Sequence, residues 1–243
     1  MLLAGPLGRI GMNPLPIQPV KIHRPPLRHD VLSRERLNDW LDGAVGGRVA
    51  LVIAEAGFGK TTLLADWARR ARRTMAWYRL EPDDRDWLAF IRHLVATGQE
   101  IDPAFAPETY DLLLALGPGG PSRDDLTASI AREIGEFASS LPDGMSLLFD
   151  DYHAIDGSPE TEPIMRALLE QTGPSFSMVI AARTAPSLPL GHIRSRGAVS
   201  RIDGDALCFT VPEAERLFRE AYHQPLDQDV VTDLIDRTQG WPA

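Results

Sequence analysis

Apolar positions along this 243-residue chain follow two different periods. A continuous apolar run at residues 49–53 is typical of a strand buried on both faces, and mainly apolar runs at 75–78, 145–149 and 176–182 also predict strands. A last short strand is predicted over residues 199–202. Between most of these runs, apolar residues recur at helical spacing, around residues 63–71, 87–95, 112–116, 130–137 and 164–169. Strands that alternate with helices predict an α/β three-layer sandwich, in which helices cover both faces of a parallel sheet.

Helices are also predicted before the first strand and after the last. Leu37, Trp40 and Leu41 have helical spacing behind a Ser33 cap, and Gly43 closes this helix. After Gly204 the strands stop, and residues 210–213 form a Thr-x-x-Glu capping box that begins another helix. A last helix around residues 230–235 ends at Gly240-Trp241-Pro242. Two helices cannot bury their apolar faces alone, so we expect the start of a helical lid in a longer protein.

Charge divides the chain into unequal parts. Residues 1–29 hold four basic residues and no acidic ones, which leaves a formal charge of −13 for the remainder. The basic part is either a solvated, extended lead-in or a contact for nucleic acid or an acidic partner. The acidic remainder is not expected to bind DNA. We therefore expect an extended, proline-rich basic arm over 1–30, a core over 31–204 and the beginning of a lid over 205–243.

Composition indicates the setting of the protein. The lone Cys208 cannot form an internal disulfide, which fits a reducing, cytoplasmic environment. No stretch approaches the roughly 20 apolar residues of a membrane span, and the first residues lack the pattern of a signal peptide. We expect a cytoplasmic protein that does not contact a membrane.

A glycine-rich loop follows the first strand. Residues 54–61 match the phosphate-binding pattern G-x-x-x-x-G-K-[ST], except that Ala54 replaces the first glycine. Lys60 is one of only two lysines in the chain. Its compact ammonium group suits a phosphate chain better than the wide fork of arginine. The alternative is a chance glycine turn between strand and helix. The residues expected to bind a nucleotide such as ATP or ADP are Ala56, Gly57, Phe58, Gly59, Lys60, Thr61 and Thr62.

An acidic pair ends the strand at residues 145–149. Mg²⁺ keeps several waters and wants carboxylates to receive them, and ligands of open α/β sheets bind at the carboxyl ends of the strands. We expect Thr61 and Asp150 to hold Mg²⁺, and Asp151 to orient or deprotonate an attacking water. Without the glycine-rich loop, two aspartates at a strand end would indicate only a turn.

Two groups of arginines require separate interpretations. Arg183 follows the strand at residues 176–182, where it can sense the γ-phosphate of a nucleotide or lie free on the surface. Arginines at positions 69, 70, 72 and 73 end the helix after the loop, and we interpret them as a solvated helix end favoured by the macrodipole.

Several blocks match one family in order. They are residues 25–28 with 33–37, 56–67, 76–80 with 83–84, 149–153, 182–184 with 188–190, 207–210 and 240–243. Together they resemble the ATPase module of the MalT-like STAND regulators. These are signal-transduction ATPases of the large LuxR type, with a helical repeat sensor and a C-terminal DNA-binding domain. The sequences Asp-Asp-Tyr-His at 150–153 and Gly-Trp-Pro-Ala at 240–243 are more specific than the phosphate loop alone.

The resemblance implies a P-loop NTPase fold of the AAA+/ASCE kind and a set of roles. Lys60, Thr61 and Asp150 would bind Mg-ATP, Asp151 would support hydrolysis and Arg183 would read the γ-phosphate. The stretch around Val31 and Arg34 would flank the adenine, and Pro242 would belong to the lid. His153 matches the motif, but we derive no role for it beyond capping a turn.

In that family ADP holds an inactive monomer, ATP with an inducer opens it into an oligomer that activates transcription, and hydrolysis resets the switch. We expect this chain to be such a nucleotide switch, with self-association in the ATP state and DNA contacts made only by a C-terminal domain absent from this sequence. The alternatives are an ATPase motor or phosphotransferase with sustained turnover, and a structural relic that binds no nucleotide. Against a phosphotransferase, the sequence shows no separate acceptor-binding constellation, although residues 98–125 leave room for one.

Overall fold

The fold is built on one parallel sheet. The computed structural model describes residues 17–195 and 197–242, without the side chain of His192. Five strands lie in the order β2-β3-β4-β1-β5, and every neighbouring pair is parallel. The strands are β1 (Val49–Ile53), β2 (Thr74–Arg79), β3 (Met145–Asp150), β4 (Phe176–Ala182) and β5 (Val199–Asp203). The five predicted strands and the α/β class are therefore confirmed.

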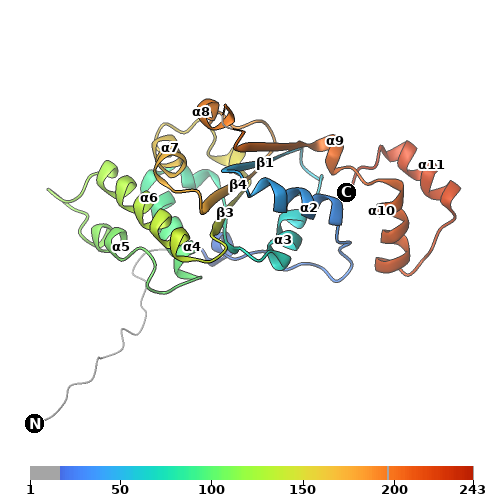
Figure 1. Ribbon diagram of the computed structural model, residues 1–243, viewed down its shortest axis with the longest axis horizontal. Helices are drawn as coiled ribbons and strands as arrows, with labels where there is room; N and C mark the ends of the chain where they lie inside the picture. Colours follow the sequence, from blue (N-terminus) through green and yellow to red (C-terminus); the bar gives the residue numbers. More distant parts are fainter. Residues whose placement is uncertain (1–16, 196, 243) are drawn as a thin grey trace, which may run out of the picture.

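Helices cover both faces of this sheet (Figure 1). Ala50 and Val52 point toward α2 (Glu35–Ala44) and α3 (Lys60–Arg70), with which they share one hydrophobic cluster. Val49, Leu51 and Ile53 belong to the opposite cluster, formed with α4, α5, α6 and α7. These are α4 (Trp87–Gln99), α5 (Pro107–Leu114), α6 (Arg123–Ser140) and α7 (Glu162–Gln171). Successive residues of β1 thus face opposite hydrophobic clusters, which explains why apolar residues run through this strand without interruption.

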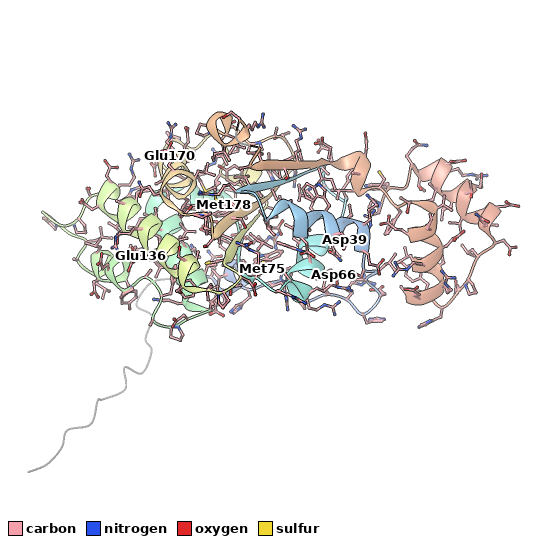
Figure 2. All side chains as sticks on the ribbon, viewed as in Figure 1. Asp39, Asp66, Met75, Glu136, Glu170 and Met178 are labelled. Carbon is pink, nitrogen blue, oxygen red and sulfur yellow. The ribbon has the colours of Figure 1, made fainter. Side chains whose placement is uncertain are left out.

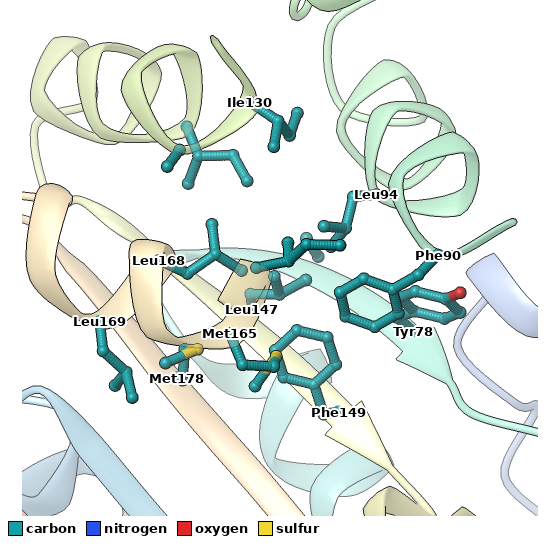
Figure 3. Close-up of a cluster of buried hydrophobic side chains, with 14 of the residues drawn as sticks. Tyr78, Phe90, Leu94, Ile130, Leu147, Phe149, Met165, Leu168, Leu169 and Met178 are labelled. Atoms are coloured by element: carbon teal, nitrogen blue, oxygen red, sulfur yellow. The ribbon is translucent and has the colours of Figure 1, made fainter. Parts of the chain in front are cut away.

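Aromatic side chains fill the second cluster beneath α4. Tyr78 stacks on Phe90 with ring centroids 5.4 Å apart, and Phe90 stacks on Phe149 at 6.0 Å. Figure 3 shows these three rings beside Leu147 and Met165, with the Tyr78 hydroxyl at the edge of the cluster. Because Phe149 immediately precedes Asp150, this packing fixes the end of β3.

The start of α2 differs from its prediction. Arg34, not Ser33, precedes the first helical residue, and the Ser33 hydroxyl instead donates to Asp66 Oδ2 at 2.7 Å. Asp66 lies on α3, where Figure 2 labels it, so Ser33 ties two segments together instead of capping a helix. Gly43 lies within α2, which continues to Ala44. The helix predicted at residues 112–116 begins earlier, at Pro107, and ends at Leu114.

The described basic residues of the arm fall into two kinds: Arg24 and Arg28 are exposed, as a solvated segment predicts, whereas that interpretation is wrong for Lys21. Residues 1–16, which include Arg9, lie outside the described part. The short helix α1 (Pro19–Ile22) packs against β2, and Lys21 is buried with 1 % of its surface exposed. The prediction failed because the opposite charge lies far along the chain: Lys21 Nζ donates to both carboxylate oxygens of Asp84, at 3.1 and 3.0 Å.

Helices follow β5 and extend away from the sheet at one end of the molecule (Figure 1). The predicted capping box is confirmed: the Thr210 hydroxyl accepts from the Glu213 amide at the start of α10. No helix in the described ranges is long and apolar enough to cross a bilayer. The remaining elements are η1 (Pro82–Arg85), η2 (Tyr152–Ala154), α8 (Gly191–Arg194), α9 (Gly204–Leu207), α10 (Val211–Arg216), the π-helical turn η3 (Leu217–Ala221) and α11 (Gln228–Thr238).

Candidate functional site

The glycine-rich loop joins the end of β1 to the start of α3. Gly57 and Gly59 have φ angles of +87° and +72°, which residues with a Cβ rarely adopt, so the chain curls back before the helix begins. Ala56 and Gly57 are exposed, and Phe58 and Gly59 are partly buried. The first helical turn carries Lys60, Thr61 and Thr62 in succession. This puts the free amides of a helix N-terminus next to the loop, as in anion-binding sites.

Lys60 is folded back into its own loop. Its Nζ donates to the carbonyl oxygens of Ala54 at 2.6 Å and Glu55 at 2.9 Å. Burial lowers the pKa of this ammonium group, while the charges of Asp151 and Asp150 oppose the change. The lysine thus has two neutral carbonyl partners and a nearby pair of carboxylates, and an anion such as a phosphate would supply the missing close counter-charge.

Thr61 and Asp150 meet across the gap between α3 and β3. The Thr61 hydroxyl donates to Asp150 Oδ2 at 2.8 Å, and Asp150 Oδ1 accepts from the Asp151 amide at 3.1 Å. Burial raises the pKa of Asp150 to about 6, partly offset by the Thr61 hydrogen bond. A hydroxyl and a desolvated carboxylate within hydrogen-bond distance form an oxygen donor set, which fits a small hard cation such as Mg²⁺.

Asp151 lies beside this pair in an unusual backbone conformation. Its φ of +58° is left-handed, so its side chain leaves the strand direction and turns toward two basic groups. Arg79 Nε lies 3.4 Å from Asp151 Oδ2, and His153 Nδ1 lies 3.9 Å from Oδ1. The His153 nitrogen is buried and has no hydrogen-bond partner among the described residues.

Arg183 is exposed just after β4 and belongs to the same electrostatic group. Burial, and after it the charge of Arg183, lowers the pKa of His153, and Arg183 also lowers that of Lys60. The structure therefore brings together Lys60, Thr61, Asp150, Asp151 and Arg183, as the sequence predicts. The sequence did not predict that Arg79 belongs to this group, because its place opposite Asp150 depends on the register between β2 and β3. The only local signal was an arginine directly after the predicted strand.

A pocket of about 230 Å³ lies beside the loop, lined by residues that precede α2, by the loop and α3, and by the segments that follow β5. Its wall is largely apolar, which suits a flat ring system such as a nucleotide base. The lining residues are Arg28, Asp30, Val31, Leu32, Arg34, Phe58, Gly59, Thr62, Leu63, Asp66, Phe209, Leu217, Tyr222 and Pro242. The predicted residues Val31, Arg34, Phe58, Thr62 and Pro242 thus line one pocket.

The guanidinium group of Arg34 binds the segment that follows β5. It donates to the carbonyl oxygens of Leu207 and Cys208, both at 2.6 Å, and to the Glu213 carboxylate at 3.2 and 2.9 Å. Its charge also lies over the Phe209 ring, 4.5 Å from the centroid. With four donor contacts made inside the protein, Arg34 lines the pocket and joins the start of α2 to the segment that follows β5.

Sequence similarity relates this chain to a known transcriptional regulator. No protein-family model matches the chain. The HTH-type transcriptional regulator MalT of Cronobacter sakazakii is 30% identical over 223 residues, which is 92% of this chain and 24% of that protein. The chain therefore spans about a quarter of the length of this relative.

A solved structure shows the same fold. It is a STAND protein with a tetratricopeptide repeat sensor from Pyrococcus horikoshii, with a TM-score of 0.57 at 17% identity. The match covers 93% of this chain and 30% of that one.

Proposed function

The chain is a MalT-like P-loop ATPase module of the STAND class, and on this premise we propose that it binds ATP and ADP and hydrolyses ATP slowly. In this proposal the bound nucleotide is a switch in a signal-responsive transcriptional regulator. The observation that carries the proposal is the contact of 2.8 Å between Thr61 and Asp150, next to the buried Lys60. It joins the phosphate loop to the acidic strand end, as a nucleotide with a bound cation requires.

Each residue of the site has a proposed role. Lys60 and the amides from Ala56 to Thr62 hold the β- and γ-phosphates, and Thr61 and Asp150 would hold Mg²⁺. When bound, Mg²⁺ neutralises charge on the phosphate oxygens. Asp151 accepts a hydrogen bond from the attacking water and orients it, and Arg183 senses whether the γ-phosphate is present.

The pocket next to the loop holds the base in this proposal. Val31 and Arg34 flank it on the core side, and Phe209 and Pro242 on the lid side. Because the wall joins both parts, we propose that base binding stabilises one arrangement of the lid. Residues 31–204 would then form the ATPase core and residues 205–243 the beginning of the lid.

Further roles are proposed for a longer regulator that would contain this chain. We propose that the ATP-bound form self-associates, that DNA is bound by a separate C-terminal domain, and that the protein acts in the cytoplasm. The relative MalT is named as an HTH-type transcriptional regulator, which supports a transcriptional output.

The rate of ATP hydrolysis under multiple-turnover conditions tests the switch. We expect both ATP and ADP to bind, and hydrolysis on the order of 10⁻² per second or slower, as in nucleotide switches without an activating partner. A steady rate between about 1 and 100 per second would contradict the switch and support a motor or phosphotransferase. Asp151→Asn should abolish even the slow rate while ADP still binds.

A further inference from the structure

Lys21, the second lysine of the chain, lies in a buried polar cluster where α1 packs against β2. Lys21 and Asp84 are exposed by 1 % and 0 % and form a direct ion pair. The Asp84 carboxylate also accepts from the Tyr78 hydroxyl at 2.8 Å and from the Glu81 amide at 2.7 Å. Its two oxygens therefore receive four hydrogen bonds, counting both from Lys21.

Other titratable groups complete the cluster. Glu81 lies 3.4 Å from Lys21 Nζ, and His93 Nδ1 lies 3.5 Å from Asp84 while bonding to the Ala89 carbonyl. Burial and the Asp84 charge raise the pKa of Tyr78, and burial lowers the pKa of His93. Lys21 is therefore the cation that balances this buried carboxylate, and removing it leaves Asp84 without its counter-charge.

The cluster is connected to the acidic strand end through the residues that follow Tyr78. Arg79 lies opposite Asp150 in the parallel register and pairs with Asp151. The Leu80 amide donates to the Asp150 carbonyl at 2.9 Å. The Tyr78 ring also packs against Phe149, with centroids 6.1 Å apart. Asp84 therefore accepts hydrogen bonds from both ends of the segment, Tyr78 and Glu81. Between these ends, Arg79 pairs with the Asp151 side chain and the Leu80 amide binds the Asp150 carbonyl.

From this chain of contacts we infer that Lys21 is a positioning residue of the nucleotide site, which acts through Asp84 and the segment from Tyr78 to Glu81 on Asp150 and Asp151. The inference rests on the proposed function. Lys21 would thus support ATP hydrolysis although it lies outside the phosphate loop and contacts neither Asp150 nor Asp151.

The test compares Lys21→Met with Glu133→Gln. The methionine side chain keeps the apolar stem of the lysine and loses the charge. Glu133 is also a buried carboxylate, which receives the amides of Glu108 and Thr109 at the start of α5, but it contacts no residue of the site. It lies one turn from Glu136, which Figure 2 shows on α6, away from the lid. Both substitutions perturb a buried polar cluster, and only the first perturbs the segment that touches Asp150.

We expect Lys21→Met to lower kcat for ATP hydrolysis by about tenfold, as loss of an indirect support of a metal ligand does. The dissociation constant for ADP without Mg²⁺ should stay within about twofold, because the phosphate loop is unchanged. Glu133→Gln should leave both quantities at the parent value. An unchanged kcat in Lys21→Met, or an equal fall in both variants, would overturn the inference.

A parent protein that binds no nucleotide would instead refute the proposed function, so the two failures are distinguishable. If Lys21→Met does not fold, Asp84→Asn replaces it, because asparagine has nearly the same volume as aspartate. The same fall in kcat would then support the inference and an unchanged kcat would overturn it.

Discussion

Burial decides how single charged residues of this protein behave. Asp150 and Lys60 are both almost inaccessible to solvent. Burial raises the pKa of Asp150 and lowers the pKa of Lys60, so that the neutral form of each group is favoured. A ligand that brings a phosphate and a cation together would stabilise the charged forms, because the phosphate is a counter-charge for Lys60 and the cation is one for Asp150. The same residues in solvated positions would have little to gain.

Asp150→Asn should therefore stabilise the protein in the absence of Mg²⁺ and nucleotide. The pKa of Asp150 is raised from 3.8 to about 6, so folding favours the protonated carboxyl. The parent then loses stability relative to the variant as pH rises from about 4 to about 6. We expect Asp150→Asn to be more stable by about 3 kcal/mol at a pH of about 7.5, with most of the difference lost near a pH of about 4.

Urea denaturation at several pH values measures this difference. Asp143→Asn is the matched control, because Asp143 is an exposed carboxylate near the opposite end of the same strand and should show no such dependence. If Asp150→Asn is instead less stable than the parent near neutral pH, the buried carboxylate is stabilised as an anion and the expectation is wrong.

At the scale of elements, a buried ion pair between Arg34 and Glu213 joins the start of α2 to the helices that follow β5. Glu213 serves α10 twice, since its side chain completes the capping box and also receives Arg34 from the start of α2. Burial of Glu213 is offset by these hydrogen bonds, which lower its pKa. Gly240 adds a close contact, because its carbonyl accepts from the Phe209 amide at 2.7 Å and a Cβ there would lie 2.4 Å from the Phe209 oxygen.

Glu213→Ala should destabilise the protein by about 3 kcal/mol, because it leaves Arg34 buried without its carboxylate and removes a helix cap. Glu215→Ala is the control, since Glu215 is a more accessible glutamate on the same helix and should cost less than about 0.5 kcal/mol. Thermal or urea unfolding of both variants decides the point. If Glu213→Ala and Glu215→Ala are equally stable, the ion pair between Arg34 and Glu213 does not stabilise the packing of α10 against α2.

At the scale of the whole molecule, local patterns predicted the elements but not the contacts between distant segments. Strand runs and the phosphate loop are local signals, so β1 to β5 and the residues from Ala56 to Thr62 were recognisable in the sequence. The order β2-β3-β4-β1-β5 places Arg79 beside Asp150, and no local pattern encodes that neighbourhood.

Lys21 shows the same limit more sharply. Among prolines and other basic residues it has the sequence pattern of a solvated arm, and its partner Asp84 lies 63 positions further along the chain. Arg34 was expected to flank the adenine, and it lines the pocket beside the loop. Its hydrogen bonds to Leu207, Cys208 and Glu213 depend on how the segment after β5 packs against α2. Long-range ion pairs of this kind are visible only once the fold is known.

The central claim is that Lys60 and its loop bind a nucleotide, and the affinities of Lys60→Ala for ATP and ADP test it most directly. Isothermal titration should show both dissociation constants raised at least about tenfold over the parent, because charge-assisted contacts to phosphate are lost. Arg72→Ala removes one exposed positive charge beyond the same helix and should bind like the parent. Equal affinities in Lys60→Ala and the parent, with the helical circular dichroism signal intact, would contradict the account.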